Sequence, residues 1–472
     1  MGCAKDASLT PPLDSLLLIL LPLPLLLPRH LLLRTPLVLF NSTAASVTVV
    51  MRLLNCHTLE FKEFLGSNIP TYLILSHRWG EDEVSYKDFC KGRNKEGAGY
   101  KKIMEFCSFA GRRKILPRGL AQKDVDSQAL CHQWVWVDTC CIDKRSSAEL
   151  SEAINSMYRW YEQAAECIVH LSDVPSMAAD QDAAMRALEE SSWFTRGWTL
   201  QELLAPRVVI FGTSQWEVMG YISTTFQGNR SFPGPYGPDL TAKVSEITCI
   251  PERILRYDDR NWVRRPPSIA QVMSWAAHRV TTRSEDTAYC LLGLFGINMP
   301  LLYGEGEQAF RRLQVELIAR SSDQSIFAFD SSPSARILAI SPAEFKSSSD
   351  VVPCPDVMPF SYAVTNRWVE IECDEAVLMP FASSTDHDEV YLISLNCALK
   401  SRHSGASRLD DLVHFNTGRV VLLLGRVQGR STTNLYRRLS DSEAIRKLAM
   451  HRASYLRGRV ECVVQKKFIV HT

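Results

Sequence analysis

Three short apolar segments alternate with two helical segments between Trp134 and Phe211, and this alternation limits the possible folds more than any other feature of the chain. The apolar segments, at residues 134–140, 167–171 and 208–211, have the length and composition of buried β-strands. A similar segment precedes them at residues 72–76. Strands separated by helices pair in parallel, because the helix returns the chain to the end of the sheet at which the previous strand began. The sequence therefore predicts an α/β fold with a parallel sheet.

The first of the two helices begins at a capping signal. Ser146 and Glu149 have the spacing of a capping box, in which each side chain bonds the backbone amide of the other residue. The apolar residues that follow share one helical stripe, so this helix is expected to pack on the sheet. These residues are Leu150, Ile154, Met157, Tyr158 and Tyr161.

The second helix carries a carboxylate and an indole on one face. If Ser192 is the N-cap and each residue advances by about 100°, one side of the helix is apolar and is expected to be buried. Glu202 and Trp198 fall on the other side, together with Thr195 and Thr199. A large aromatic residue beside a carboxylate is unusual on a plain solvated surface. Glu202 and Trp198 are therefore expected to face away from the core.

This face of the helix is a candidate site. In open α/β sheets, ligands bind at the carboxyl ends of the strands, and the loops at residues 76–80 and 139–144 follow such ends. Glu202 has the chemistry to stabilise an oxocarbenium-like centre or to activate a water molecule. Trp198 or Trp79 has the shape to stack on a flat ring.

Glu202 also has a structural interpretation, in which it forms an ion pair with Arg196 or Arg78 and holds the helix to the first loop. Asp138, at the end of a buried strand, is either functional or bonded to the amides of the next loop. His77 is a candidate acid or base, or a loop residue with a capping role.

The bulk composition excludes several classes of protein. The 53 basic residues nearly cancel the 52 acidic ones, so no overall charge draws the chain to nucleic acid. The 14 cysteines form no Cys-x-x-Cys pair and no zinc-site spacing, so no metal is expected. Most cysteines lie in apolar segments, which indicates reduced thiols and a cytoplasmic protein. Cys140 and Cys141 fit the core better than a nucleophilic role, because no histidine is placed to activate them.

Residues 1–50 have a different character from the rest. Residues 16–27 are almost all leucine, but Pro22 and Pro24 interrupt them and the run is too short to span a membrane. We expect a disordered extension, a leader, or a start placed upstream of the true one at Met51. Membrane association is expected only if the apolar segment is a genuine anchor.

The remaining sequence is expected to form two domains. The first covers residues 51–330, with an α/β core to about residue 212, followed by an irregular insertion and a helical extension. Helical segments of this first domain are expected at residues 268–279, 287–295 and 305–319. A second capping box, Thr282 to Glu285, precedes the middle one. Short alternating stretches after a Ser/Pro-rich linker predict a smaller β-rich accessory domain at residues 331–472.

Several of these segments resemble the fungal HET (heterokaryon incompatibility) domain. The strings Tyr-Leu-Ile-Leu-Ser-His-Arg-Trp-Gly and Arg-Gly-Trp-Thr-Leu-Gln-Glu-Leu carry the likeness most clearly, at residues 72–80 and 196–203. Further similar strings lie at residues 136–143, 151–158, 282–293 and 299–306. The resemblance covers about residues 51–330. It implies a fungal protein of non-self recognition whose activity ends in programmed cell death.

The HET domain is more distantly similar to TIR domains, which are flavodoxin-like modules of innate immunity. Some TIR domains cleave NAD with a helix glutamate, and this resemblance implies that Glu202 is the catalytic glutamate. It also implies that the pocket is lined by Ser76, Arg78, Trp79, Asp138, Asp143 and Trp198. No glycine-rich phosphate loop follows any strand, so NAD as a substrate is implied by the resemblance alone.

Two hypotheses follow from the resemblance. In the first, the domain is a TIR-like signalling module that associates with itself and with another incompatibility or signalling protein. In the second, the same domain is an NAD glycohydrolase that uses Glu202. The sequence leaves the choice between them open.

Overall fold

The structure is a computed structural model. It describes residues 50–113, 132–223, 236–256, 266–330, 336–353, 362–365, 368–372, 376–379, 390–399, 419–426, 435–438, 461–463 and 467–471. The extension predicted at residues 1–50 lies outside these residues, except for Val50. Within the described ranges, none of the helices combines the length and the hydropathy that crossing a bilayer requires.

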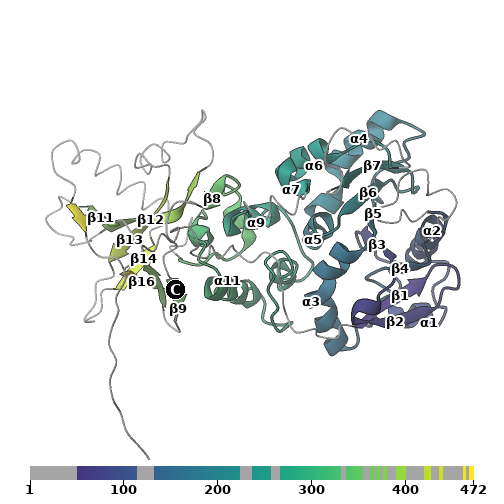
Figure 1. The fold of residues 1–472 in the computed structure, drawn as a ribbon, viewed down its shortest axis with the longest axis horizontal. Helices are drawn as coiled ribbons and strands as arrows, with labels where there is room; N and C mark the ends of the chain where they lie inside the picture. Colours follow the sequence, from purple (N-terminus) through teal and green to yellow (C-terminus); the bar gives the residue numbers. More distant parts are fainter. Residues whose placement is uncertain are drawn as a thin grey trace, which may run out of the picture. The chain divides into compact units, whose positions relative to one another are not determined.

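A seven-stranded sheet forms the first part of the fold (Figure 1), in the order β2-β1-β4-β3-β5-β6-β7. Its strands are β1 (Val50–Asn55), β2 (Phe61–Leu65), β3 (Tyr72–His77), β4 (Trp134–Trp136), β5 (Glu166–His170), β6 (Val208–Gly212) and β7 (Val218–Ser223). The four central strands, β4, β3, β5 and β6, are parallel, which confirms the predicted α/β character.

The two edges of this sheet differ from the prediction of a parallel sheet. Strands β1, β2 and β7 are antiparallel to their neighbours. Short connections explain two of these pairs, β1–β2 and β6–β7, because residues 56–60 and 213–217 are too few to carry a helical crossover and each connection forms a hairpin. Strand β2 leaves Lys62 and Glu63 exposed at one edge. At the other edge, Tyr221 of β7 exchanges backbone hydrogen bonds with the segment at residues 238–240.

Helices fill the connections between the strands. They are α1 (Tyr86–Cys90), α2 (Ala98–Arg112), α3 (Ser147–Gln163), α4 (Gln181–Glu190) and α5 (Thr199–Leu204). Ser146 caps α3 as predicted, because its hydroxyl accepts a hydrogen bond from the Glu149 amide at 3.3 Å. The reciprocal half of the predicted box differs: the Glu149 carboxylate accepts from the Asp143 amide at 2.7 Å.

The helical extension contains α6 (Thr241–Thr248), α7 (Glu252–Leu255), α9 (Ile269–Ala276), α10 (Asp286–Tyr289) and α11 (Gln308–Arg320). The predicted capping box at Thr282 is wrong, and α10 is a single turn that no side chain caps. Glu285 instead accepts hydrogen bonds from the amides of Gly304 and Gly306, at 2.7 and 3.1 Å. The capping box of the extension belongs to α9, between Ser268 and Gln271.

Gly293 fixes how closely the extension approaches α3. A Cβ atom at this position would lie 2.2 Å from the Cβ of Tyr158, which is anchored to the helix backbone and has no freedom to move away. We expect Gly293→Ala to lower the free energy of unfolding by about 1–3 kcal/mol, as overpacking does. Urea denaturation measures this effect. Gly80→Ala is the control, because the nearest atom to its Cβ is 3.9 Å away; equal midpoints for the two variants would contradict the prediction.

The C-terminal part is β-rich, as predicted. Its strands are β8 (Val351–Pro353), β9 (Tyr362–Val364), β10 (Trp368–Glu372), β11 (Ala376–Met379), β12 (Val390–Leu399), β13 (Arg419–Arg426), β14 (Leu435–Arg438), β15 (Glu461–Val463) and β16 (Lys467–His471). They form a nine-stranded sheet in which β14 and β16 pair in parallel and the other pairs are antiparallel. The predicted boundary at residue 330 stays a prediction.

Candidate functional site

Glu202 is buried, with 7% of its surface exposed, and it joins α5 to the carboxyl end of β3. Ser76, the penultimate residue of β3, donates its hydroxyl proton to Glu202 Oε2 at 2.5 Å. The indole Nε1 of Trp193 in turn donates to Ser76 Oγ at 2.9 Å. These side chains form a buried hydrogen-bonded chain of an indole, a hydroxyl and a carboxyl group.

The prediction that Glu202 faces away from the core is wrong, because the predicted helix is interrupted. Residues Ser192–Thr195 form a short 3-10 helix, and α5 begins only at Thr199. Ser191, not Ser192, provides the cap. The interruption changes the rotational phase of the helix, so all six residues of α5 are buried.

Burial determines the charge of Glu202. Loss of solvent raises the pKa of its carboxyl group to about 8, and the negative charge of Asp138 acts in the same direction. Hydrogen bonds from Ser76 and Tyr161, and the positive charge of Arg196, oppose this rise. Among the described ion pairs, none includes Glu202, so the predicted pairing with Arg196 or Arg78 is not formed. At neutral pH the carboxyl group is mostly protonated.

Asp138 and Trp79 form the more open part of the site. The Trp79 indole donates to Asp138 Oδ2 at 2.8 Å, and the side chain is 39% exposed. Lys144 places its ammonium group 3.5 Å from the centre of the indole ring, and the Arg196 guanidinium lies 5.7 Å from it. A flat ligand that stacks on Trp79 would compete with Lys144 for the ring.

His77, a predicted candidate acid or base, lies beside Asp138 together with Glu83, which was not predicted as a site residue. His77 Nε2 is 3.7 Å from Glu83 Oε1 and 3.9 Å from Asp138 Oδ1. Lys102 contacts the same Glu83 oxygen at 2.5 Å. Burial alone would raise the pKa of Glu83, but His77 and Lys102 lower it to about 2. For Glu83 the sequence offered only a run of acidic residues after β3, which is typical of a loop, so Glu83 could not be recognised as a site residue.

Three predicted residues lie apart from this group in their contacts. Asp143 forms a two-bond ion pair with Arg145, at 2.6 and 2.8 Å. The Trp198 side chain forms a hydrogen bond with the carboxyl group of Asp286, in the extension. Arg78 is exposed on the loop after β3. The structure therefore brings together Glu202, Ser76, Trp79 and Asp138, but gives the other three no contact with them among the described interactions.

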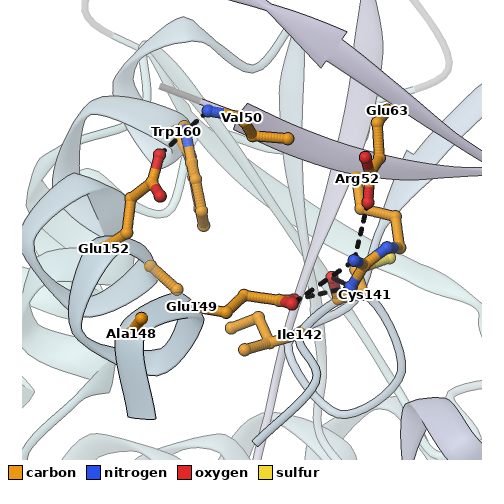
Figure 2. A pocket seen from close by; sticks show the side chains of 10 residues that line it. Val50, Arg52, Glu63, Cys141, Ile142, Ala148, Glu149, Glu152 and Trp160 are labelled. Carbon is orange, nitrogen blue, oxygen red and sulfur yellow. Dashed lines mark hydrogen bonds and ion pairs between the residues drawn. The ribbon is translucent and has the colours of Figure 1, made fainter. Parts of the chain in front are cut away.

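A cavity of about 260 Å³ lies elsewhere, between β1, the loop after β4 and the start of α3. Figure 2 shows Arg52 between two acidic residues that line the cavity. The Arg52 guanidinium contacts Glu63 at 2.7 Å and Glu149 at 2.6 Å. Glu152 accepts a hydrogen bond from the Val50 amide at 2.9 Å. The cavity is lined by none of the seven predicted site residues.

Comparison with known proteins shows what part of the chain is similar to. Residues 72–180 match the family described as Heterokaryon incompatibility protein (HET). The chain is also 40% identical, over 262 residues, to the Vegetative incompatibility protein HET-E-1 of Podospora anserina. This alignment covers 54% of the chain but only 17% of that relative. No solved structure matches the chain. The match confirms the resemblance of residues 72–180 to the HET domain.

Proposed function

We propose that this protein acts in vegetative incompatibility, as a non-self recognition protein whose HET domain triggers programmed cell death. The observation that carries this proposal is the 40% identity over 262 residues to an incompatibility protein. We further propose that the domain is residues 51–330 and that it signals by associating with itself and with another incompatibility protein. Several described cysteines are free thiols, which supports a cytoplasmic location; they are Cys90, Cys107, Cys140, Cys141, Cys167, Cys249 and Cys290.

The environment of Glu202 favours a signalling module over an enzyme. Its carboxyl group is buried, and Ser76 and Trp193 extend the hydrogen bonding into the core. A protonated carboxyl group at this position is suited to hold α5 against β3. It is less suited to stabilise a positive charge, because that role requires the ionised form.

Expression of the full chain in a fungal host tests this proposal through cell death. Under a structural role, Glu202→Gln keeps the killing activity, because a neutral amide still accepts the Ser76 hydrogen bond. Glu202→Ala loses it, because that partner is removed. Glu189→Ala, at an exposed carboxylate that pairs with Lys243, is the matched control. Loss of killing by a Glu202→Gln protein that folds normally would reject the structural role.

The second candidate function is NAD hydrolysis, and one observation favours it. Glu202, Asp138 and Trp79 all lie at the carboxyl ends of β3 and β4 or contact residues there, where α/β sheets bind ligands. In this reaction the bond between nicotinamide and ribose breaks, nicotinamide leaves with the electron pair, and water adds to the ribose carbon and releases a proton. Ionised Glu202 would stabilise the oxocarbenium-like centre.

Incubation of the concentrated full chain with NAD tests the second candidate by the release of nicotinamide. Because the pKa of Glu202 is about 8, activity that depends on its ionised form rises as the pH approaches 8. Glu202→Gln then abolishes release at every pH, whereas Glu189→Gln does not. Absence of release from the wild type, also when the chains are forced to oligomerise, would reject this candidate and leave the signalling function.

A further inference from the structure

A single arginine of the extension is bonded to the beginning of α5. Arg279, which follows α9, donates from one guanidinium nitrogen to the backbone oxygen of Arg196 and to the hydroxyl of Thr199, both at 2.9 Å. Its Nε donates to the backbone oxygen of Trp275 at 3.1 Å. The guanidinium therefore links the end of α9 to the interruption that precedes α5.

The backbone beside Arg279 reinforces this link. The Val280 amide donates to the Thr195 oxygen at 2.7 Å, and the Gly197 amide donates to the Val280 oxygen at 2.9 Å. Gly197 is required for this close approach, because a Cβ there would lie 2.5 Å from Thr281 Cγ2 and 3.3 Å from Cys290 Sγ. Residues 279–281 thus contact the chain at the point where the 3-10 helix ends.

Helix α5 has little intrinsic reason to form. It has only six residues, and its N-cap residue, Trp198, makes no side-chain capping bond. Isolated helices of this length are unstable in water, because the first turn costs more conformational entropy than its hydrogen bonds return. The orientation that directs Glu202 toward Ser76 must therefore come from tertiary contacts.

Arg279 carries a positive charge without a carboxylate partner among the described ion pairs. Burial lowers the pKa of its guanidinium to about 10, so the group stays charged at neutral pH. Cys290 and Glu202 are the groups whose negative charge would raise that pKa. The cost of burying this charge is offset by its three hydrogen bonds, of which two reach the beginning of α5 and one reaches Trp275 of α9.

We propose that Arg279 is a positioning residue, which sets the start and the rotation of α5 and so directs Glu202 toward Ser76. The functional unit then includes the extension, beyond the matched residues 72–180. The cellular part of the test rests on the proposed function, whereas the structural part does not.

Hydrogen exchange of the full chain tests the structural part. Arg279→Met is expected to speed exchange of the α5 amides by about tenfold, because the hydrogen bonds that order this helix are lost. Arg283→Met is the matched control, since Arg283 is an exposed arginine of the same segment that lies over the Tyr303 ring. Equal exchange of the α5 amides in the two variants would overturn the proposal.

A titration separates positioning from general stabilisation. The infrared carboxyl band of Glu202 is expected to titrate at a higher pH in Arg279→Met, because a nearby positive charge is removed, and to return toward the wild-type value in Arg279→Lys. An unchanged titration in Arg279→Met would count against the proposal.

A second variant, which leaves Arg279 and its charge in place, keeps the proposal testable if Arg279→Met fails to fold. Gly197→Ala disturbs the close approach of Thr281 and Cys290 to the chain before α5 and is expected to speed exchange of the same α5 amides. Unchanged exchange in Gly197→Ala would overturn the proposal. If Arg279→Met loosens α5 but still kills cells, the positioning role stands and the proposed function of the Glu202 site is rejected.

Discussion

The wild-type protein is expected to lose stability as the pH rises from about 5 to 8, and the Glu202→Gln variant is expected to lose much less. The pKa of Glu202 is about 8 in the folded protein, compared with 4.5 for an ordinary glutamate. Between these values the folded protein holds a proton that the unfolded chain has released. Raising the pH therefore favours unfolding, and the loss by pH 8 is on the order of 4 kcal/mol. Below pH 4.5 both states hold the proton, so Glu202 contributes its full stabilisation.

Urea denaturation at pH 5.5, 7 and 8.5 measures this effect. The informative quantity is the difference in unfolding free energy between variant and wild type at each pH, because other titrating groups cancel in it. This difference is expected to grow with pH in favour of Glu202→Gln. In the exposed control Glu189→Gln it is expected to stay constant. Parallel stability profiles for Glu202→Gln and the wild type would contradict the raised pKa.

Replacing Arg113 with methionine is expected to destabilise the protein by about 3–5 kcal/mol, the usual result of removing one partner from a buried ion pair. Arg113 Nε donates to Glu166 Oε2, and both side chains are only 9% exposed. Tyr236 donates to the other Glu166 oxygen at 2.8 Å. Without Arg113, the carboxylate at the start of the central strand β5 keeps one hydrogen bond and no opposing charge.

A double variant distinguishes the cost of the unpaired charge from the value of the pair. Arg113→Met combined with Glu166→Leu is expected to recover much of the stability, because no buried charge remains. Arg112→Met is the control, since Arg112 is the exposed neighbour and contacts only Ser108 among the described hydrogen bonds. A double variant no more stable than Arg113→Met alone would show that packing, not charge, causes the loss.

The sequence predicted the elements that depend on local pattern. The apolar segments at residues 72–76 and 167–171 became the parallel strands β3 and β5, and the stripe after Ser146 became the buried face of α3. The antiparallel edges were missed, because none of their strands, β1, β2 and β7, was recognised in the sequence. The lengths of their connecting loops held the necessary signal.

The site was predicted less well, for a physical reason. The direction in which Glu202 points depends on the interruption before Thr199. This interruption is hydrogen-bonded to Arg279 and Val280, about eighty positions later in the chain. A helical wheel assumes one continuous helix and cannot contain this information. Asp143 is different, because its partner Arg145 is two residues away and a local ion pair could have been anticipated. The strand pattern predicted that Ser76 lies near the end of a strand, and Ser76 is the penultimate residue of β3.

The two edges of the seven-stranded sheet are protected in different ways. On β2, the exposed Lys62 and Glu63 would meet their own like charges if two copies stacked edge to edge in register. On β7, the backbone N–H and C=O groups of Tyr221 are already hydrogen-bonded to the segment at residues 238–240. Crowding of these chains therefore has no easy route to fibrils through this sheet.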